Sequence, residues 1–395
     1  MTATSSSARR ALLLVLDGVG CGPAPDTEAY GDAGSDTLGN VARHVGGLSL
    51  PHLAQLGLGN VAALPGVSPV ATPGAAWGVA LPRSAGKDST TGHWEIAGVQ
   101  LAQPFPTYPQ GFPEEVLAPF VAATGRGVLA NCAASGTAVI ADFAERQRAT
   151  GDWIVYTSAD SVFQIAAHEE WIPLDELYRA CEIARRQLVA PHDVSRVIAR
   201  PFVGEPGAWT RTANRRDYAV PAPATTLLDA LAEAGVPRHG VGKVDDLFAG
   251  RNLTAEHTRD NAEGGARLLE WLATAERGFC FANLVDFDTL YGHRNDVAGF
   301  ARALEAFDAT VPALLAALRE DDLLIITADH GNDPTTASTD HARERVPLLV
   351  VGPRLRPVPL GVRATFADLG ASVAEWFGLP WRGQGTSFLA TCGLA

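Results

Sequence analysis

The chain has 395 residues, which is enough for two or three domains with buried cores. Its formal net charge of −13 argues against a surface that binds nucleic acid, and no apolar stretch approaches the length of a membrane span. Arg9 and Arg10 precede an apolar run, as in an export signal, but this run is only six residues long and reaches Asp17 without a small-residue cleavage site.

That apolar run, residues 11–16, predicts the first buried strand of the chain. Asp17 follows it directly and enters a turn that contains Gly18 and Gly20. An unpaired carboxylate is costly inside a core, so packing explains Asp17 poorly. A site at the carboxyl end of the strand explains it better.

Three successive hydroxyl residues, Ser89, Thr90 and Thr91, lie where the glycine-rich segment 86–95 is expected to enter a helix. A helix start offers free amide donors and the positive end of a dipole, which suits a phosphorylated side chain. Ser and Thr at such places also serve as ordinary N-caps. The pattern therefore leaves both a nucleophile and a helix cap open.

Prolines mark both ends of a region, residues 103–221, that interrupts the alternation of strands and helices. They are Pro104, Pro106, Pro109 and Pro113 at one end and Pro221 and Pro223 at the other. The pattern predicts a domain inserted through two linkers into a second domain, which is made of residues 1–102 and 222–395.

A group of arginines lies in the predicted insertion, although the chain as a whole is acidic. The group consists of Arg196, Arg200, Arg211, Arg215 and Arg216. Arginine forks bind phosphate bidentately, but a solvated basic surface explains Arg215 and Arg216 equally well. Asp160 also has two explanations: it accepts hydrogen bonds from sugar hydroxyls, or it caps a helix predicted over residues 161–169.

After residue 222 the patterns of strand and helix alternate again. Helices are predicted over residues 225–234, 261–274, 297–318 and 365–377, and strands over residues 279–285, 323–327 and 346–351. This order is typical of a mostly parallel sheet that is covered by helices on both faces.

Two of these strands end, like the first one, at carboxylate and histidine residues. The six candidate metal ligands near the three strand ends are Asp17, Asp288, His293, Asp329, His330 and His341. Carboxylate oxygens and imidazole nitrogens suit Mn, Zn or Fe. Six ligands are enough for two ions, an arrangement that clamps the attacking and leaving oxygens of a phosphoryl transfer.

Eight segments of the chain together resemble the phosphopentomutases of the alkaline phosphatase superfamily. They are residues 17–20, 34–40, 86–98, 156–170, 196–202, 285–296, 326–334 and 339–349. The metal-binding pieces alone indicate only the superfamily, whereas segment 86–98 and the start of segment 156–170 are much more specific. The resemblance implies an alkaline phosphatase-like α/β core of three layers, with an inserted α+β cap domain for substrate binding.

The resemblance also implies an activity and its cofactors. The expected enzyme interconverts ribose or deoxyribose 1-phosphate and 5-phosphate through a phosphoenzyme and a bisphosphate intermediate, and a bisphosphorylated sugar activates it. One Mn²⁺ would be held by Asp288, His293 and His341, and the other by Asp17, Asp329, His330 and the nucleophile. The hydroxyl residue directly after Lys87 and Asp88 is usually Thr in the family, so Ser89 is the expected nucleophile, with the same alcohol and one methyl fewer.

Lysine and cysteine usage adds two further expectations. Only two lysines, Lys87 and Lys243, occur against 29 arginines, which suggests positions where a compact ammonium is needed. Lys243 therefore joins Asp160, Arg196, Arg200 and Arg211 as a predicted substrate-binding residue. The five cysteines show neither paired nor metal-type spacing, which favours reduced thiols in a cytoplasm.

Other functions remain compatible with these patterns. A cofactor-independent phosphoglycerate mutase or a plain phosphatase of the same superfamily would use similar metal ligands. A non-catalytic phosphosugar-binding protein could keep the insertion and the arginines, but it would not need six metal ligands together with a hydroxyl nucleophile.

Overall fold

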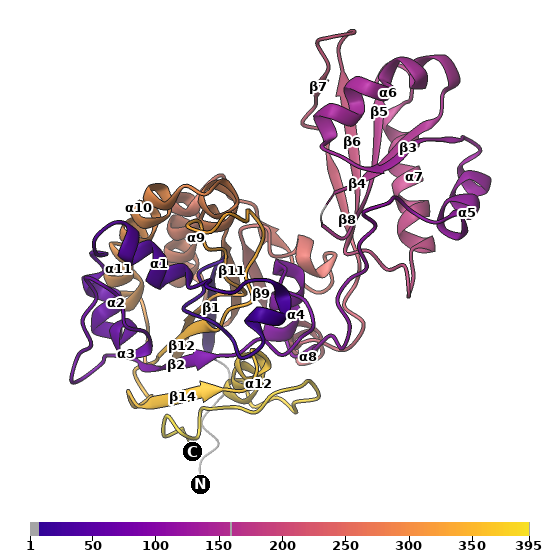
Figure 1. Ribbon diagram of the computed structural model, residues 1–395. Helices are drawn as coiled ribbons and strands as arrows, with labels where there is room; N and C mark the ends of the chain where they lie inside the picture. Colours follow the sequence, from indigo (N-terminus) through magenta and orange to yellow (C-terminus); the bar gives the residue numbers. More distant parts are fainter. Residues whose placement is uncertain (1–7, 159, 395) are drawn as a thin grey trace. The chain divides into compact units, whose positions relative to one another are not determined.

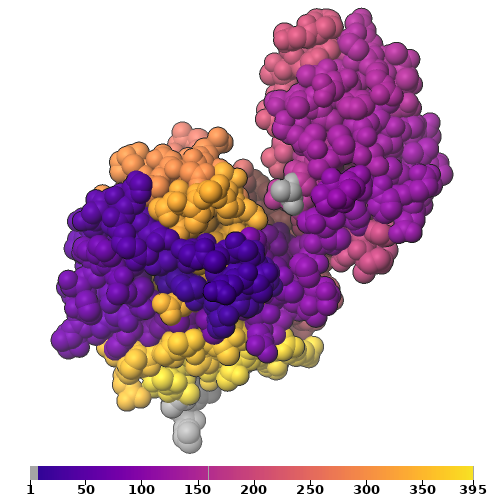
Figure 2. All heavy atoms as spheres, in the orientation of Figure 1, coloured from indigo at the N-terminus to yellow at the C-terminus, as the bar shows by residue number. Residues whose placement is uncertain are grey.

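The computed structural model describes residues 8–158 and 160–394. The chain divides into two compact units, which we call the core unit (Met1–Gln103 with Ala222–Ala395) and the insert (Pro104–Pro221). Figure 1 traces the chain through both units, and Figure 2 shows each of them as a continuous body of atoms. The insert begins one residue later than the predicted insertion of residues 103–221.

An eight-stranded sheet forms the centre of the core unit, in the order β10-β9-β11-β1-β12-β13-β2-β14. Its strands are β1 (Arg10–Leu16), β2 (Ala76–Ala80), β9 (Arg238–Val241), β10 (Ala255–Glu256), β11 (Gly278–Leu284), β12 (Asp322–Thr327), β13 (Val346–Val351) and β14 (Pro359–Arg363). Only β13 runs antiparallel to its neighbours. The prediction of a mostly parallel sheet is therefore confirmed.

The three central strands β11, β1 and β12 are apolar runs that are buried along their whole length. Leu16 of β1 is paired with Leu284 of β11, and Val15 is paired with Thr327 of β12. All three strands therefore end at the same level on one edge of the sheet. Polar residues that follow them are brought together there, as expected for parallel strands.

Helices cover both faces of this sheet (Figure 1). They are α1 (Thr37–His44), α2 (Pro51–Leu56), α3 (Leu58–Val61), α4 (Ser89–Ile96), α8 (Leu227–Glu233), α9 (Asn261–Thr274), α10 (Val297–Asp308), α11 (Val311–Ala316) and α12 (Ala367–Trp376). Helices α1, α2, α9, α10 and α11 pack together on one side, and α4, α8 and α12 on the other. The expected three layers are thus confirmed.

One helix of the core unit differs from its prediction. Residues 297–318 form two helices, α10 and α11, instead of a single one. Pro312 lies in the first turn of α11, where it has no amide hydrogen to donate and its ring excludes the preceding turn of a continuous helix. The apolar spacing continues through the break, which is why the pattern alone suggested one helix.

The insert is built on a second, mixed sheet in the order β3-β4-β5-β6-β7, with β8 also paired to β6. Its elements are α5 (Glu114–Thr124), β3 (Val128–Ala133), α6 (Gly136–Thr150), β4 (Trp153–Thr157), β5 (Val162–His168), α7 (Leu174–Gln187), β6 (Arg196–Val203), β7 (Thr210–Arg211) and β8 (Arg216–Ala219). Helices α5 and α7 cover one face of the sheet, and α6 covers part of the other.

The helix predicted over residues 161–169 is wrong, because this segment forms β5. β5 lies between β4 and β6, and all seven of its residues are buried. A short apolar run that is covered on both faces lacks the alternation of a surface strand, so its periodicity does not distinguish it from a buried helix. Asp160 consequently caps no helix.

The chain leaves and re-enters the core unit at neighbouring points. The backbone N–H of Leu227, at the start of α8, donates a hydrogen bond of 2.8 Å to the carbonyl of Ala97, at the end of α4. Gly98 is fixed in the same way, since its carbonyl accepts from the N–H of Gln384 at 2.9 Å. Both flanks of the insertion are therefore part of the packed core unit.

Candidate metal centre and nucleophile

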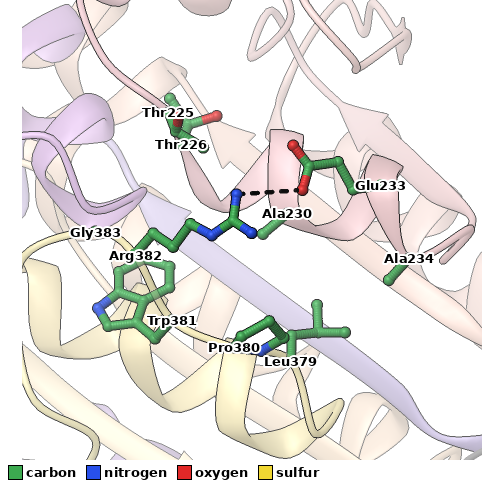
Figure 3. Close-up of a pocket in the computed structure, with 10 residues that line it drawn as sticks. All are labelled: Thr225, Thr226, Ala230, Glu233, Ala234, Leu379, Pro380, Trp381, Arg382 and Gly383. Atoms are coloured by element: carbon green, nitrogen blue, oxygen red, sulfur yellow. Dashed lines mark ion pairs between the residues drawn. The ribbon is translucent and has the colours of Figure 1, made fainter.

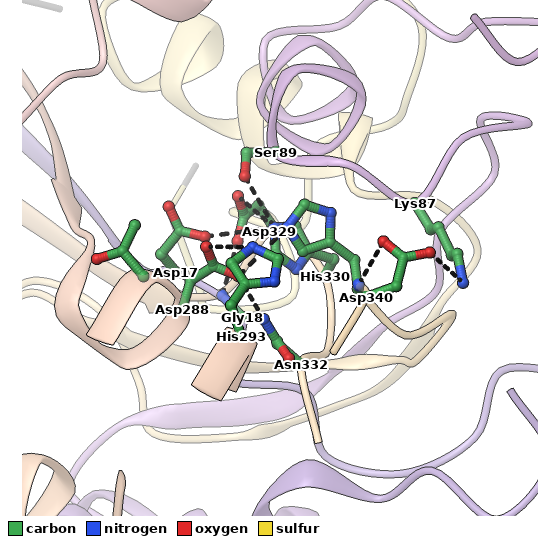
Figure 4. A network of polar contacts seen from close by, with 12 residues as sticks. Asp17, Gly18, Lys87, Ser89, Asp288, His293, Asp329, His330, Asn332 and Asp340 are labelled. Atoms are coloured by element: carbon green, nitrogen blue, oxygen red, sulfur yellow. Dashed lines mark hydrogen bonds and ion pairs between the residues drawn. The ribbon is translucent and has the colours of Figure 1, made fainter. Parts of the chain in front are cut away.

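Four of the predicted ligands lie at the shared edge of the three central strands (Figure 4). Asp17 follows β1, Asp288 lies in a π-helical turn (Phe287–Tyr291) after β11, and Asp329 and His330 follow β12. All four side chains are buried, with at most 4% of each residue exposed. Three buried carboxylates at one place require a positive partner, because uncompensated charge is expensive in a core.

These residues form two groups that could each hold a metal ion. One group contains Asp17, Asp329 and His330, and the other contains Asp288, His330 and His341. Within each group the ligand atoms lie within 4.8 Å of one another. His330 belongs to both groups, so the two candidate sites are adjacent.

Several ligand atoms face one another without a hydrogen bond. Nε2 of His330 lies 3.3 Å from Oδ1 of Asp17 and 3.4 Å from Oδ2 of Asp329. Oδ1 of Asp17, Oδ2 of Asp329 and Nε2 of His341 are all buried and have no hydrogen-bond partner among the described residues. Buried lone pairs of this kind normally find a donor, so their convergence fits a cation as the missing partner.

His293 and His341 complete the second group from the loop side. Nε2 of His293 lies 3.1 Å from Oδ2 of Asp288, and Nε2 of His341 lies 3.3 Å from Oδ1 of the same carboxylate. Nδ1 of His293 is 2.5 Å from the carbonyl of Thr339, which keeps the proton on Nδ1 and leaves Nε2 as the ligand atom. The structure thus brings all six predicted ligands together at one place.

The protonation of this centre reflects its concentrated negative charge. Burial, followed by the charges of Asp329 and Asp288, raises the pKa of Asp17. Burial disfavours protonated His330, but the charges of Asp329, Asp17 and Asp288 outweigh it and raise the pKa of this histidine well above its ordinary value. A bound cation would supply the positive charge that protons otherwise provide.

The pKa of His293 is raised to about 9. Burial alone would lower this pKa, but the hydrogen bond with Asp288 and the negative charge of Asp288 have a larger, opposite effect. Burial would raise the pKa of Asp288, but His341 and His293 hold it well below its usual range.

Ser89 is the first residue of α4, and its hydroxyl points toward the same centre (Figure 4). Its Oγ lies 3.0 Å from Nε2 of His330. Thr90 and Thr91 are buried, and the Thr91 hydroxyl donates to Asp88 at 2.6 Å. Asp88 is the N-cap of α4, so the capping role that the sequence left open for the three hydroxyls belongs to Asp88.

Gly92 brings α4 close to the metal ligands. A Cβ atom at this position would lie 2.3 Å from the carbonyl oxygen of Asp329, closer than any side chain could come. Only glycine therefore allows the first turn of α4 to pack directly on the end of β12. This close contact holds the Ser89 hydroxyl at the ligand cluster.

The predicted arginines of the insert divide between its structural elements. Arg196 and Arg200 lie on β6, four residues apart, and therefore on the same face of the sheet. Arg211 on β7 is exposed, and Arg215 precedes β8. Arg216 packs over the ring of Tyr178 on α7, at 4.0 Å from the ring centroid, so it lies with the opposite face.

The face that carries Arg196 and Arg200 is more polar than a packed core. Nε of Arg200 donates to Oε1 of Gln164 at 3.1 Å, and burial, followed by the charge of Arg215, lowers the pKa of Arg200. The hydroxyl of Tyr156 is buried there and has no hydrogen-bond partner among the described residues. Asp160 is exposed in the loop between β4 and β5.

Comparison with known proteins decides the family. A model of the metalloenzyme superfamily matches residues 9–381. A phosphopentomutase from Anaeromyxobacter sp. (strain K) is 57% identical over 384 residues, which cover 97% of this chain and 98% of that protein. A phosphopentomutase from Dictyoglomus thermophilum is 54% identical over 385 residues, which cover 97% and 98%. The chain belongs to the phosphopentomutase family. The family expected from the eight segments is confirmed, and with it the expectation of a metal-dependent enzyme.

Two solved structures share the fold of this phosphopentomutase-family chain. A Leishmania mexicana phosphoglycerate mutase matches with a TM-score of 0.50 at 14% identity, covering 96% of this chain and 97% of that one. The PH0037 protein from Pyrococcus horikoshii matches with the same score at 16% identity, covering 96% and 100%. At such identities the likeness concerns the fold alone, and it confirms the alkaline phosphatase-like fold class.

The structure adds positioning residues that the sequence patterns did not indicate. Nδ2 of Asn332 donates to Oδ1 of Asp288 at 2.6 Å, and Nδ2 of Asn283 donates to Oδ2 of Asp17 at 2.7 Å. His93, which is fully buried, places Nδ1 3.1 Å from Oδ2 of Asp329 and 2.9 Å from the carbonyl of Ser89. Asn332 and His93 lie inside segments 326–334 and 86–98. Their closeness in sequence to predicted ligands is therefore the feature that could have identified them as positioning residues.

The two lysines of this phosphopentomutase-family chain lie in different surroundings. Nζ of Lys87 bridges two carboxylates, at 2.9 Å from Asp32 and 3.2 Å from Asp340, and so joins the loop before Ser89 to the loop before His341 (Figure 4). Lys243 is exposed after β9. No helix in the described part of the chain is both long and apolar enough to cross a membrane.

The core unit also has a hollow of about 210 Å³ that contains none of the predicted ligands (Figure 3). Its walls include Thr225, Trp381 and Arg382, and the guanidinium of Arg382 lies 3.8 Å from the carboxylate of Glu233. None of the metal-ligand groups found among the described residues lies in this hollow, so it does not compete with the strand-end centre as a metal site.

Proposed function

We propose that this chain is a phosphopentomutase that interconverts ribose or deoxyribose 1-phosphate and the corresponding 5-phosphate. Relatives that bear this name and are 54–57% identical over nearly the whole chain support the proposal. The observation that carries it is the position of a hydroxyl, Ser89, 3.0 Å from a histidine shared by two metal-ligand groups.

Ser89 is the proposed nucleophile. In the phosphorylated enzyme, a free hydroxyl of the pentose phosphate forms a bond to the phosphorus on Oγ while the bond between Oγ and phosphorus breaks, which gives a sugar bisphosphate and moves the hydroxyl proton to the serine side. After this bisphosphate turns round, Oγ forms a bond to the other phosphorus as the bond between that phosphorus and its sugar oxygen breaks, and this oxygen leaves with the proton. The first turn of α4 directs backbone N–H groups and the positive end of its dipole at this position, which stabilises a phosphate. The Thr91 hydroxyl is bonded to Asp88, whereas the Ser89 hydroxyl contacts His330, which favours Ser89 as the nucleophile.

The six ligands are proposed to hold two Mn²⁺ ions, a metal that suits mixed carboxylate and imidazole ligands. Asp17, Asp329 and His330 would hold one, and Asp288, His293 and His341 the other, with His330 close enough to serve both. The bound ions would stabilise negative charge on the serine oxygen and on the transferring phosphoryl group. Asn332 and Asn283 keep the carboxylates of Asp288 and Asp17 in place for this purpose.

The insert is proposed to recognise the part of the substrate that is not reacting. The proposed residues are Arg196, Arg200 and Arg211 for phosphate, Asp160 for sugar hydroxyls, and Lys243 of the core unit as a further cation. Remote binding energy of this kind would favour transfer to a pentose phosphate over transfer to water. Activation by a bisphosphorylated sugar and a cytoplasmic location complete the proposal.

A coupled assay tests this function directly. The purified protein, loaded with Mn²⁺ and primed with a bisphosphorylated pentose or hexose, is supplied with ribose 1-phosphate, and formation of ribose 5-phosphate is followed. Parallel reactions contain 3-phosphoglycerate or a generic phosphomonoester. Faster turnover of either alternative than of ribose 1-phosphate would refute the proposed substrate.

Mass spectrometry of the primed enzyme identifies the nucleophile. We expect phosphate on Ser89 in the wild type, no phosphopeptide in Ser89→Ala, and retained activity in Ser89→Thr. Phosphate on Thr90, or undiminished turnover of Ser89→Ala, would show that the nucleophile is another residue.

A further inference from the structure

Asp217, at the start of β8, forms ion pairs with two arginines, Arg196 and Arg215, on the face of the insert's sheet that carries Arg196 and Arg200. Its carboxylate accepts two parallel hydrogen bonds from Arg215, from Nε at 2.6 Å and from Nη2 at 2.5 Å. Nη1 of Arg196 lies 3.5 Å from the same carboxylate. Asp217 is paired with Ile198 across the sheet, which places its side chain on the face that carries Arg196.

The arginines of this region are not balanced by carboxylates. Asp217 lies within ion-pair distance of both Arg196 and Arg215, whereas among the described residues neither Arg200 nor Arg211 has a carboxylate at that distance. Arg200 is half-buried, and its pKa is lowered by burial first and then by the positive charges of Arg215 and Arg211. A region with this excess of guanidinium groups favours a second anion.

The fork of Arg215 and the carboxylate of Asp217 show the geometry in which a guanidinium holds a planar pair of oxygens. Two oxygens of a phosphate monoester would be held in the same way. Asp217 therefore occupies N–H donors of Arg215 that could otherwise hold a phosphate, and its negative charge lies 3.5 Å from Arg196, which is proposed to bind the phosphate. Both effects weaken phosphate binding.

We propose that Asp217 is a built-in competitor of the substrate phosphate, which limits how tightly the arginines of the insert hold it. The inference rests on the proposed function, in which the bisphosphate intermediate must release its first phosphate contacts in order to turn round. An anion site without an internal carboxylate would hold a doubly charged phosphate more firmly and release it more slowly. Asp217 thus favours turnover over affinity.

An ordinary structural role makes the opposite prediction. If Asp217 only orients Arg196 and Arg215 for the substrate, its loss would leave both side chains less ordered and weaken phosphate binding. The two roles therefore differ in the sign of the change in the dissociation constant Kd. Asp217 is only partly buried, with 18% of its side chain exposed, so its replacement by the isosteric Asn is compatible with folding.

Binding is best measured where transfer is blocked. In a full-length, Mn²⁺-loaded Ser89→Ala background, titration calorimetry with ribose 5-phosphate compares Asp217→Asn, Arg196→Ala and Asp175→Asn. Asp175, on α7, is the matched control: its removal changes the charge of the insert equally, but it is 74% exposed, is paired with Arg179 and lies on a helix that covers the opposite face.

We expect Asp217→Asn to lower the Kd by about three- to tenfold, Arg196→Ala to raise it by at least about tenfold, and Asp175→Asn to leave it unchanged. In the Ser89 enzyme, Asp217→Asn should lower KM and also lower kcat, because release of the phosphate becomes slower. Thermal melting verifies that each variant is folded.

The outcomes separate this inference from the proposed function. Weaker or unchanged binding in Asp217→Asn, with weaker binding in Arg196→Ala, overturns the role of Asp217 and leaves the proposed phosphate site intact. Unchanged binding in Arg196→Ala overturns both. An equal gain in Asp217→Asn and Asp175→Asn would show a general charge effect and would also overturn the role of Asp217.

Discussion

Glu344 gives the core unit a pH-dependent stability that can be calculated from its surroundings. The side chain is fully buried, and its carboxylate accepts hydrogen bonds from the N–H of Thr37 at 2.9 Å, the hydroxyl of Thr37 at 2.7 Å and the N–H of Gly22 at 3.2 Å. Burial raises the pKa of Glu344 from its ordinary 4.5 to about 7, the three donors oppose this change, and the charge of Asp333 adds to it.

The rise in the pKa of Glu344 from 4.5 to about 7 corresponds to about 3 kcal/mol of folding free energy, because each tenfold change in proton affinity is worth about 1.4 kcal/mol. The folded state binds the proton more tightly than the unfolded state. The stabilisation is therefore fully present below pH 4.5 and is lost as the pH rises through 7. Glu344→Gln cannot ionise and keeps an acceptor for Thr37 or Gly22, so it should not lose this stability.

Urea unfolding of the wild type and Glu344→Gln at pH 5, 6, 7 and 8 measures the effect. We expect the stability of the variant relative to the wild type to rise by about 2 to 3 kcal/mol across this range, because other titrating groups are common to both proteins. A difference that is constant with pH would mean that Glu344 is ionised throughout the range. A difference that falls with rising pH would refute the direction of the pKa change.

Three further predictions concern the metal centre. His341→Ala should bind about one metal ion fewer by elemental analysis and lose most of its activity; two ions with full activity would exclude His341 as a ligand. Asn332→Ala should weaken Mn²⁺ binding by about 10- to 100-fold in calorimetry, because Asp288 loses the donor that orients it, and unchanged affinity would refute that role. Lys87→Met and Asp340→Asn should show non-additive losses of turnover, with a coupling of about 0.5 to 1 kcal/mol, because the two residues join the loops that carry Ser89 and His341. Additive losses would mean that this ion pair does not hold the two loops together.

The sequence was most informative where local pattern and long-range structure agree. Each central strand is an apolar run, and the carboxylate after it has no role in a core, so Asp17, Asp288 and Asp329 stood out without knowledge of their contacts. Parallel pairing then places the three strand ends at one level, which the registers of β1 with β11 and β12 show. The candidate centre therefore followed from rules that need no contact map.

Residues that act through distant partners were not predictable in this way. Glu344 and Asn332 are polar residues near predicted ligands, but their partners, Thr37 and Asp288, are 307 and 44 positions away in the chain. Asp217 carried no sequence-based prediction, because only the pairing of β8 with β6 places it on the face that carries Arg196. The helix predicted over residues 161–169 was wrong for the same reason, since neighbours on both sides decide between strand and helix for a short apolar run.

The hydrogen bond between Leu227 and Ala97 brings the two segments of the core unit that flank the insert next to each other. Joining these two segments by a few glycine and serine residues adds little closure entropy, so the core unit should fold with its metal ligands whether or not the insert follows. The core unit, which carries the metal ligands, and the insert, which is proposed to select the substrate, could then evolve separately. An exchange of the segment between these two anchor points would give a phosphoryl-transfer core a new specificity without altering any strand of its sheet.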